Sequence, residues 1–150
     1  MAEQDIPKLQ MAKVANRVAA AQAVIEAAKD NPNIWVLTAD VANSTGMVPF
    51  SQAYPDRFLN VGVAEQTMMG IAAGLATCGK IPFAATFAFL ASMRACEQVR
   101  TDIAYANLNV KIFATHAGVA LGQGGTTHHA TEDMGIQRSF ANMTNRVPAE

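Results

Sequence analysis

An acidic residue that opens a long uncharged segment is the most informative chemical group in this sequence. Glu65 follows the Gly62-Val63-Ala64 turn, and residues 66–77 carry no charged side chain. A carboxylate in the first turn of a helix ordinarily complements the helix dipole. A helix that is apolar all round is buried, however, and an acid that opens such a helix is desolvated. We therefore expect Glu65 to face a ligand across a dry interface.

Histidines and a glycine-rich stretch form a second group of candidates. His116 follows an apolar run, and His128 and His129 come after the glycines of residues 118–125. Adjacent histidines suggest a metal, but no acidic or cysteine partner has ligand spacing here, so we expect no metal site. The glycines also resemble a phosphate cradle, but no P-loop lysine follows them. A substrate-binding loop is the interpretation that these residues favour.

Short apolar runs alternate with helical patterns along the chain. Strands are predicted at residues 34–37, 57–63, 82–86 and 110–115, and a fifth strand is predicted to begin at residues 143–147. Helices are predicted at residues 9–29, 65–77, 91–106 and 132–139, and a loop with Gly46 and Pro49 at residues 43–54. This order predicts an α/β fold, a mostly parallel sheet with helices on both faces.

The candidate residues gather where the predicted strands end. Asp40, residues 62–66, residues 86–90 and His116 all follow strands. Asp40 alone would be an ordinary helix cap. In parallel sheets, ligands bind outside the carboxyl ends of the strands. The organisation of the chain therefore predicts one site at that edge.

Composition limits the classes of partner. The chain has 150 residues, 51% of them hydrophobic and 15% charged, with a net charge of −1. We expect a single domain that buries part of its surface against another chain, and no binding to nucleic acid or membranes. No apolar run is long enough to cross a bilayer and the N-terminus is unlike a signal peptide, so a cytoplasmic protein is expected. Cys78 and Cys96 are expected to be buried, reduced thiols.

Six motifs, in order and at fitting spacing from about residue 9 onward, resemble the pyrimidine-binding domain of transketolases. Each motif alone is weak, but six in register are highly specific. The similarity is greatest to the short bacterial and archaeal forms whose two halves are separate chains. The motifs are Asp40 with Asn43-Ser44-Thr45, Arg57-Phe58, Gly62-Val63-Ala64-Glu65-Gln66, Pro82-Phe83 with Thr86-Phe87, Arg94-Ala95 with Glu97-Gln98-Val99-Arg100, and Thr115-His116.

The resemblance implies thiamine diphosphate as cofactor. It implies that Glu65 is catalytic and hydrogen-bonds a ring nitrogen of the aminopyrimidine, and that Asp40 lies near the thiazolium. It also places Phe87 in the pyrimidine pocket. The family's stacking aromatic aligns with Leu90, whereas the aromatic residue here is Phe89, so which of the two contacts the ring stays open.

The resemblance implies that His116 and His128 line the substrate channel and bind sugar hydroxyls. The substrate loop departs from the family, because Gln123-Gly124 replaces the usual acidic pair. A site built to bind a hydroxyl loses discrimination without its partner group. The donor and acceptor sugars therefore stay open.

The family holds the cofactor's diphosphate through Mg²⁺ and a Gly-Asp-Gly motif on another domain, and that motif is absent from this sequence. We expect residues 1–150 to form one domain, truncated at its C-terminal end. It would act as a homodimer or as a heteromer with a diphosphate-binding transketolase subunit that carries Mg²⁺. The implied reaction is transfer of two-carbon ketol units between sugar phosphates.

Three alternatives remain open. A deoxyxylulose-phosphate synthase and the beta subunit of a 2-oxo acid dehydrogenase share the acid and the fold. His116 followed by Ala117-Gly118, together with residues 97–100, favours transketolase over both. A non-catalytic assembly module that retains the fold is the third alternative, which Gly124 and the short length leave open.

Overall fold

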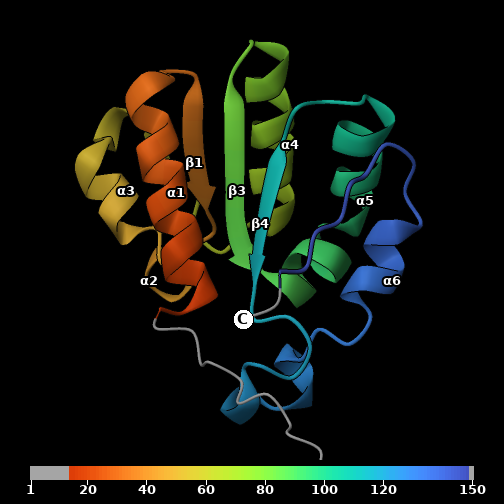
Figure 1. Cartoon of the computed structure of the whole chain (residues 1–150). Coiled ribbons are helices and arrows are strands. Elements are labelled where there is room, and N and C mark those ends of the chain that lie inside the picture. Colours follow the sequence, from red (N-terminus) through yellow and green to blue (C-terminus); the bar gives the residue numbers. More distant parts are fainter. Residues whose placement is uncertain (1–13, 149–150) are drawn as a thin grey trace, which may run out of the picture.

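A parallel sheet in the strand order β2–β1–β3–β4 forms the centre of the fold (Figure 1). The structure is a computed structural model that describes residues 14–148. Its strands are β1 (Ile34–Thr38), β2 (Phe58–Asn60), β3 (Ile81–Phe87) and β4 (Lys111–Thr115). Val36 of β1 aligns with Phe58 of β2 and with Phe83 of β3, and all neighbouring strands are parallel. The predicted parallel sheet is confirmed, although β2 is shorter than expected.

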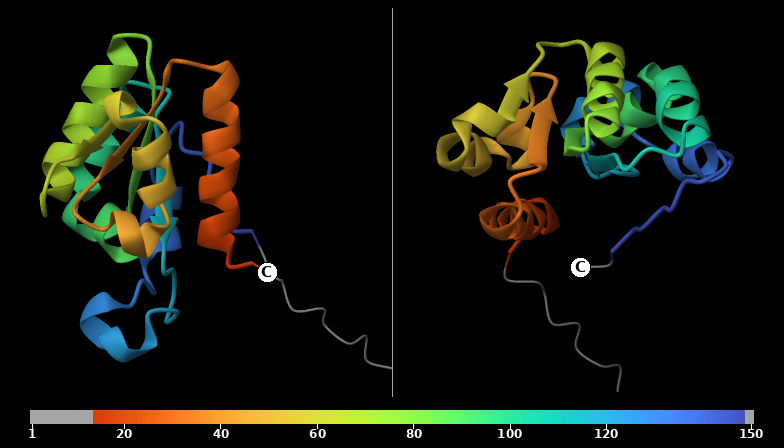
Figure 2. Two further views of the ribbon diagram at one scale, coloured as in Figure 1. Left: turned by 90° about the vertical axis from the view of Figure 1, so that its left-hand side faces the viewer. Right: turned by 90° about the horizontal axis from the view of Figure 1, so that it is seen from above.

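Helices cover both faces of the sheet, as predicted (Figure 2). Helices α1 (Asn16–Asp30) and α3 (Val48–Ala53) pack on one face, against Val36 and Ala85. Helix α4 (Glu65–Thr77) and a helical segment made of η2 (Leu90–Arg94), α5 (Cys96–Gln98) and η3 (Val99–Tyr105) pack on the other, against Leu37 and Ala84. Successive strand residues point to opposite faces, so strands covered on both sides read as continuous apolar runs.

The predicted loop at residues 43–54 is wrong, because short helices occupy most of it. Helix α2 (Ala42–Thr45) ends at Gly46, whose φ of 80° is the left-handed conformation that closes a helix. Pro49 lies in the first turn of α3, where a proline's missing N–H is tolerated. The glycine and the proline therefore mark the ends of helices rather than a loop.

Arg57 links the turn before β2 to helix α1. It ends the short helix η1 (Pro55–Arg57), and its Nη1 donates hydrogen bonds to the carbonyls of Ala28 and Asn31, both at 3.2 Å. Its guanidinium lies 4.0 Å from the ring centroid of Tyr54. A cation beside the last carbonyls of a helix stabilises that helix end.

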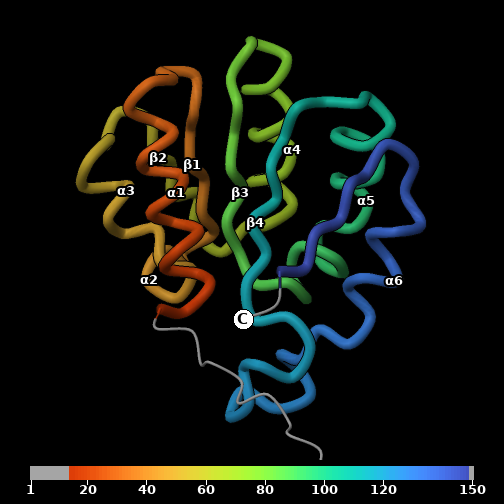
Figure 3. The backbone as a smooth tube through the Cα atoms, in the orientation of Figure 1, coloured from red at the N-terminus to blue at the C-terminus, as the bar shows by residue number. Residues whose placement is uncertain are grey.

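The C-terminal part of the described chain differs from the prediction. Helix α6 (Asp133–Arg138) confirms the helix expected at residues 132–139. Residues 143–147 form no strand, so the predicted fifth strand is wrong within residues 14–148; Figure 3 traces this segment beside β4. Asn145 and Arg146 interrupt the apolar sequence that a strand covered on both faces requires. Residues 9–13 of the first predicted helix lie outside the described residues.

Two smaller expectations concern the surface. Both cysteines are free, but Cys78 is exposed and Cys96 only partly buried, so the expected burial is wrong for Cys78 and incomplete for Cys96. Cys78 follows the last residue of α4, where the helix leaves the core. In the part of the chain that the structure describes, no helix is long and apolar enough to cross a membrane.

Candidate functional site

Unusual backbone conformations mark the carboxyl edge of the sheet, to which the arrowheads of β1, β3 and β4 point in Figure 1. Asp40, just beyond β1, has a φ of 62°, and His116, directly after β4, has a φ of 58°. Gly62, beyond β2, has a φ of 73°. Positive φ is uncommon for residues other than glycine, and such strained residues cluster at functional sites. The structure thus places the predicted Asp40 and His116 at one edge, in conformations that the surrounding structure must hold.

Glu65 is the first residue of α4 and is 1% exposed, as the sequence predicted for an acid that opens an apolar helix. Its Oε2 accepts a hydrogen bond of 2.9 Å from Nη1 of Arg94. Its Oε1 is buried and has no hydrogen-bond partner among the described residues. A buried carboxylate oxygen without a donor is costly, which makes this atom a candidate for contact with a ligand.

Four predicted site residues form a continuous aromatic row in the order His116, Phe87, Phe89 and His128. The His116 ring meets Phe87 edge-on with centroids 4.8 Å apart, and Phe87 stacks on Phe89 at 6.3 Å. The ring of His128 lies 5.2 Å from that of Phe89. Such pairs prefer edge-on or offset geometry at these distances. The aromatic row therefore joins the ends of β3 and β4 to the substrate loop.

The predicted substrate loop returns to the sheet through a bridge between Gly118 and Ala130. Two short helical turns, η4 (Gly122–Gly124) and η5 (Thr126–His128), bring His128 to the aromatic row. His128 is exposed, and its Nδ1 lies 2.9 Å from Oγ1 of Thr127. The loop lies beyond the carboxyl edge of the sheet in Figure 1.

His116 lies in a more enclosed environment than His128. Its Nδ1 is 2.8 Å from Oγ1 of Thr115, the last residue of β4. Burial lowers the pKa of His116 below its usual value, and the positive charge of Arg17 lowers it further. The neutral imidazole is therefore favoured, and it offers one nitrogen as an acceptor and the other as a donor.

Glu65 and Arg94 form a second contact, between the start of α4 and the end of η2. Arg94 belongs to one of the six motifs, but nothing in the sequence relates it to an acid 29 positions away. Leu90 is 7% exposed, whereas Phe89 is partly exposed in the aromatic row. Thr86, also without an assigned role, is fully buried, and its Oγ1 has no hydrogen-bond partner within residues 14–148. Because Thr86 is a polar residue in an otherwise apolar strand, the sequence alone could have marked it as a candidate site residue.

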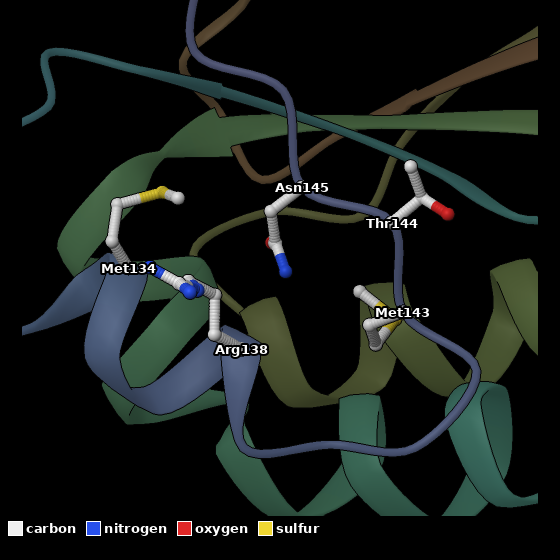
Figure 4. Close-up of a pocket in the computed structure, with 5 residues that line it drawn as sticks. All are labelled: Met134, Arg138, Met143, Thr144 and Asn145. Atoms are coloured by element: carbon white, nitrogen blue, oxygen red, sulfur yellow. The ribbon is translucent and has the colours of Figure 1, made fainter.

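Hollows on the surface lie mainly along β4 and α6. A small hollow of about 460 Å³ contains none of the predicted site residues; Figure 4 shows its lining of Met134, Arg138, Met143, Thr144 and Asn145. A larger groove of about 1460 Å³ follows β4 and includes His116 at its carboxyl end. Among the described residues, no group of three or more His, Cys, Asp or Glu side chains is placed to hold a metal.

Comparison with known proteins tests the resemblance seen in the motifs. A family model described as the transketolase pyrimidine-binding domain matches residues 12–150. The chain belongs to this family. A putative transketolase C-terminal section from Methanocaldococcus jannaschii is 48% identical to this transketolase domain over 129 residues, which are 86% of this chain and 41% of the relative.

A second relative is a 6-deoxy-6-sulfo-D-fructose transketolase subunit from Clostridium sp. strain MSTE9. It is 42% identical over 127 residues, which are 85% of this transketolase domain and 39% of the relative. A solved structure described as a split gene transketolase, inactive beta4 tetramer, has a TM-score of 0.75 and 50% identity; the match covers 86% of this chain and 41% of that one. The domain thus spans about two fifths of the length of these relatives.

Proposed function

We propose that this chain is the pyrimidine-binding half of a thiamine-diphosphate-dependent enzyme that transfers two-carbon ketol units between sugar phosphates. The observation that carries the proposal is the environment of the Glu65 carboxylate. The carboxylate is buried at the carboxyl edge of the sheet, with Oε2 held by Arg94 and Oε1 without a partner among the described residues. A ring nitrogen that carries a proton is the kind of donor that Oε1 lacks.

The residues present fit the aminopyrimidine of this cofactor. Oε1 of Glu65 and Oγ1 of Thr86 are buried polar atoms without a hydrogen-bond partner among the described residues, and the aromatic row at the ends of β3 and β4 offers ring faces and edges. When bound, thiamine diphosphate supplies the carbon nucleophile and the electron sink for cleavage of a ketose. The protein supplies hydrogen bonds, aromatic contacts and a site that excludes water.

Four side chains have roles at the cofactor in this proposal. Glu65 holds a proton between Oε1 and a pyrimidine nitrogen, and general acid–base help of this kind is typically worth about 10²–10⁴ in rate. Phe87 contacts the pyrimidine ring, and either Phe89 or Leu90 lies beside it. Asp40 lies near the thiazolium.

His116 and His128 are proposed to bind sugar hydroxyls. Because the pKa of His116 is lowered, its imidazole stays neutral near pH 7. Thr115 occupies Nδ1, which leaves Nε2 for a substrate hydroxyl. His128 reaches the same row from the loop that the Gly118–Ala130 bridge closes.

The diphosphate and its Mg²⁺ are proposed to be held by a partner subunit. The names of relatives support a partner, since proteins of similar sequence are described as a transketolase section and a transketolase subunit. The description of a solved relative as an inactive beta4 tetramer supports a chain that is inactive alone. The uncharged residues of α4 after Glu65, with the 73% exposed Val63, are the proposed contact surface in a homodimer or heteromer.

Calorimetry with thiamine diphosphate tests the proposal. The chain alone is expected to bind the cofactor weakly or not at all, since Mg²⁺-bridged diphosphate contacts dominate affinity. With a diphosphate-binding transketolase subunit added, binding is expected to become tight and Mg²⁺-dependent, and ketol transfer to appear. Tight Mg²⁺-dependent binding to the chain alone would contradict the proposal. A complex that binds cofactor but cleaves no ketose phosphate would favour an assembly module.

A further inference from the structure

The side-chain amide of Asn60 joins two turns at the carboxyl edge. Asn60 is the last residue of β2 and aligns with Thr38 of β1. Its Oδ1 accepts hydrogen bonds from the backbone N–H groups of Asp40 at 3.0 Å and Gly62 at 3.1 Å. Its Nδ2 donates to Oδ1 of Asp40 at 3.1 Å. One amide thus contacts the residue beyond β1 twice and the residue beyond β2 once.

Both turns have positive-φ residues, and that of Asp40 needs support from its surroundings. Asp40 has a φ of 62°, a strained conformation for a residue with a side chain, and Gly62 has a φ of 73°. The Gly62 turn leads directly to Glu65, and the N–H of Ala64 bonds back to the Gly62 carbonyl at 2.8 Å. A displacement of Gly62 therefore displaces the first residue of α4.

Asn60 is not required to pair the strands. The N–H of Val61 already donates to the Thr38 carbonyl at 3.0 Å, which continues the backbone pairing of β1 and β2. Asn60 is also exposed, so its side chain fills no part of the core. What its amide adds is the link between the Asp40 turn and the Gly62 turn.

We propose that Asn60 is a positioning residue that fixes Asp40 and the Glu65 turn relative to one another. This rests on the proposed function, in which the two acids meet different rings of one cofactor. Side chains on separate turns shift independently unless a common contact joins them. A misplacement of about 1 Å costs roughly a hundredfold in rate, so a single shared amide is enough to affect catalysis without touching the cofactor.

Three variants test this role. Asn60→Ala removes all three hydrogen bonds, whereas Asn60→Asp keeps the accepting oxygen and loses the donor to Asp40. The matched control is Asn33→Ala, because Asn33 is an exposed asparagine at the opposite edge of the sheet whose Oδ1 accepts from Lys80 at 3.2 Å. The first measurement is amide hydrogen exchange of Asp40 and Gly62 by NMR in the purified chain. The second is kcat of the complex with the diphosphate-binding subunit.

Asn60→Ala is expected to speed exchange at both amides about tenfold, the value of one hydrogen bond, and to lower kcat by roughly a hundredfold. Asn60→Asp keeps an oxygen that can accept from the backbone N–H of Gly62, but it places a carboxylate beside that of Asp40, where the like charges repel. It is expected to keep the exchange protection of Gly62 within about threefold of wild type and to lower kcat as Asn60→Ala does. Asn33→Ala is expected to match wild type in both measurements.

Native exchange or native kcat in Asn60→Ala would overturn the role of Asn60, as would native kcat in Asn60→Asp. These outcomes are distinct from a failure of the proposed function. A wild-type complex without thiamine-diphosphate-dependent turnover would overturn the function, while the exchange rates would still decide whether Asn60 holds the two turns.

Discussion

Arg94 donates a hydrogen bond from Nη1 to Oε2 of Glu65 at 2.9 Å, from a segment 29 positions later in the sequence. The side chain of Arg94 is 50% exposed and that of Glu65 is 1% exposed. The positive charge therefore approaches a buried carboxylate from the solvent side. Because this contact holds only one oxygen, it fixes the orientation of the carboxylate and leaves Oε1 for a ligand.

Replacement of Arg94 by leucine is expected to lower the free energy of unfolding by about 1–3 kcal/mol, because a buried carboxylate loses its charged donor. Solvent screening of the half-exposed guanidinium favours the lower end of this range. Urea unfolding measures the change. The control Arg100→Leu removes an exposed arginine of the same helical segment and should cost less than about 0.5 kcal/mol.

A double-mutant cycle separates the pair from general packing. In a Glu65→Gln background, Arg94→Leu should cost less, because no buried charge is left unpaired. An equal cost in both backgrounds would show that the ion pair has no role in stability.

Substitution of Gly124 is expected to displace His128. A Cβ at position 124 would lie 2.9 Å from Cδ2 of Leu121, closer than real Cβ atoms come, and 3.0 Å from Cβ of His128, tighter than most real Cβ contacts. Gly124→Ala should therefore move His128 from Phe89 and change the chemical shifts of the His128 ring protons. Unchanged shifts would contradict this arrangement of the loop.

Gly135→Ala is the matched control for that substitution. Gly135 lies in α6, and a Cβ there meets no atom within 4 Å. Alanine in place of glycine inside a helix should stabilise the protein by roughly 0.5–1 kcal/mol and leave the His128 shifts unchanged.

Arg17→Gln is expected to raise the pKa of His116 part of the way toward its usual value. Burial is the larger cause of the lowered pKa and remains in the variant, whereas the repulsion from Arg17 is removed. NMR titration of the His116 ring protons measures the change. A pKa that stays the same or falls would exclude the electrostatic contribution of Arg17.

The lowered pKa of His116 also predicts a pH dependence of stability. Between the folded pKa and the unfolded value of about 6.5, the unfolded chain binds more protons, so stability falls as pH drops through this window. Below the pKa of His116 in the folded protein, this loss of stability stays constant. His116→Asn should remove this contribution, and asparagine tolerates the positive φ at this position. Denaturant midpoints of both proteins from pH 7.5 to about 5 provide the test.

The strands and the longer helices were predictable because burial on both faces produces uninterrupted apolar runs, as in β1 and β3. The short helices and the C-terminal segment could not be predicted in the same way. Gly46 and Pro49 suggest a loop in sequence, yet they lie at the ends of α2 and α3. In residues 143–147, Met143 and Val147 suggested a strand, but the polar Asn145 and Arg146 between them do not support pairing with β4.

The residues of the candidate site were predictable, whereas the contacts between them were less so. Because strand ends meet at one edge, His116 and Phe87 could be expected near each other, and the burial of Glu65 followed from its apolar helix. The contact of Arg94 with Glu65 depends on the packing of η2 against α4, which no local pattern reveals. The positive φ of Asp40 could not be predicted, because a glycine is the usual sequence signal for that conformation and Asp40 is not one. Its backbone N–H instead donates to the side-chain amide of Asn60.

The central claim is that Glu65 activates a cofactor held mainly by another subunit. In the reconstituted complex, the exchange of the thiazolium ring proton of thiamine diphosphate with deuterium reports that step directly. Glu65→Gln should fold normally and slow this exchange by about 10²–10⁴. The matched control Glu97→Gln changes an exposed acid on α5 and should exchange at the native rate. Exchange at the native rate in Glu65→Gln would contradict the account.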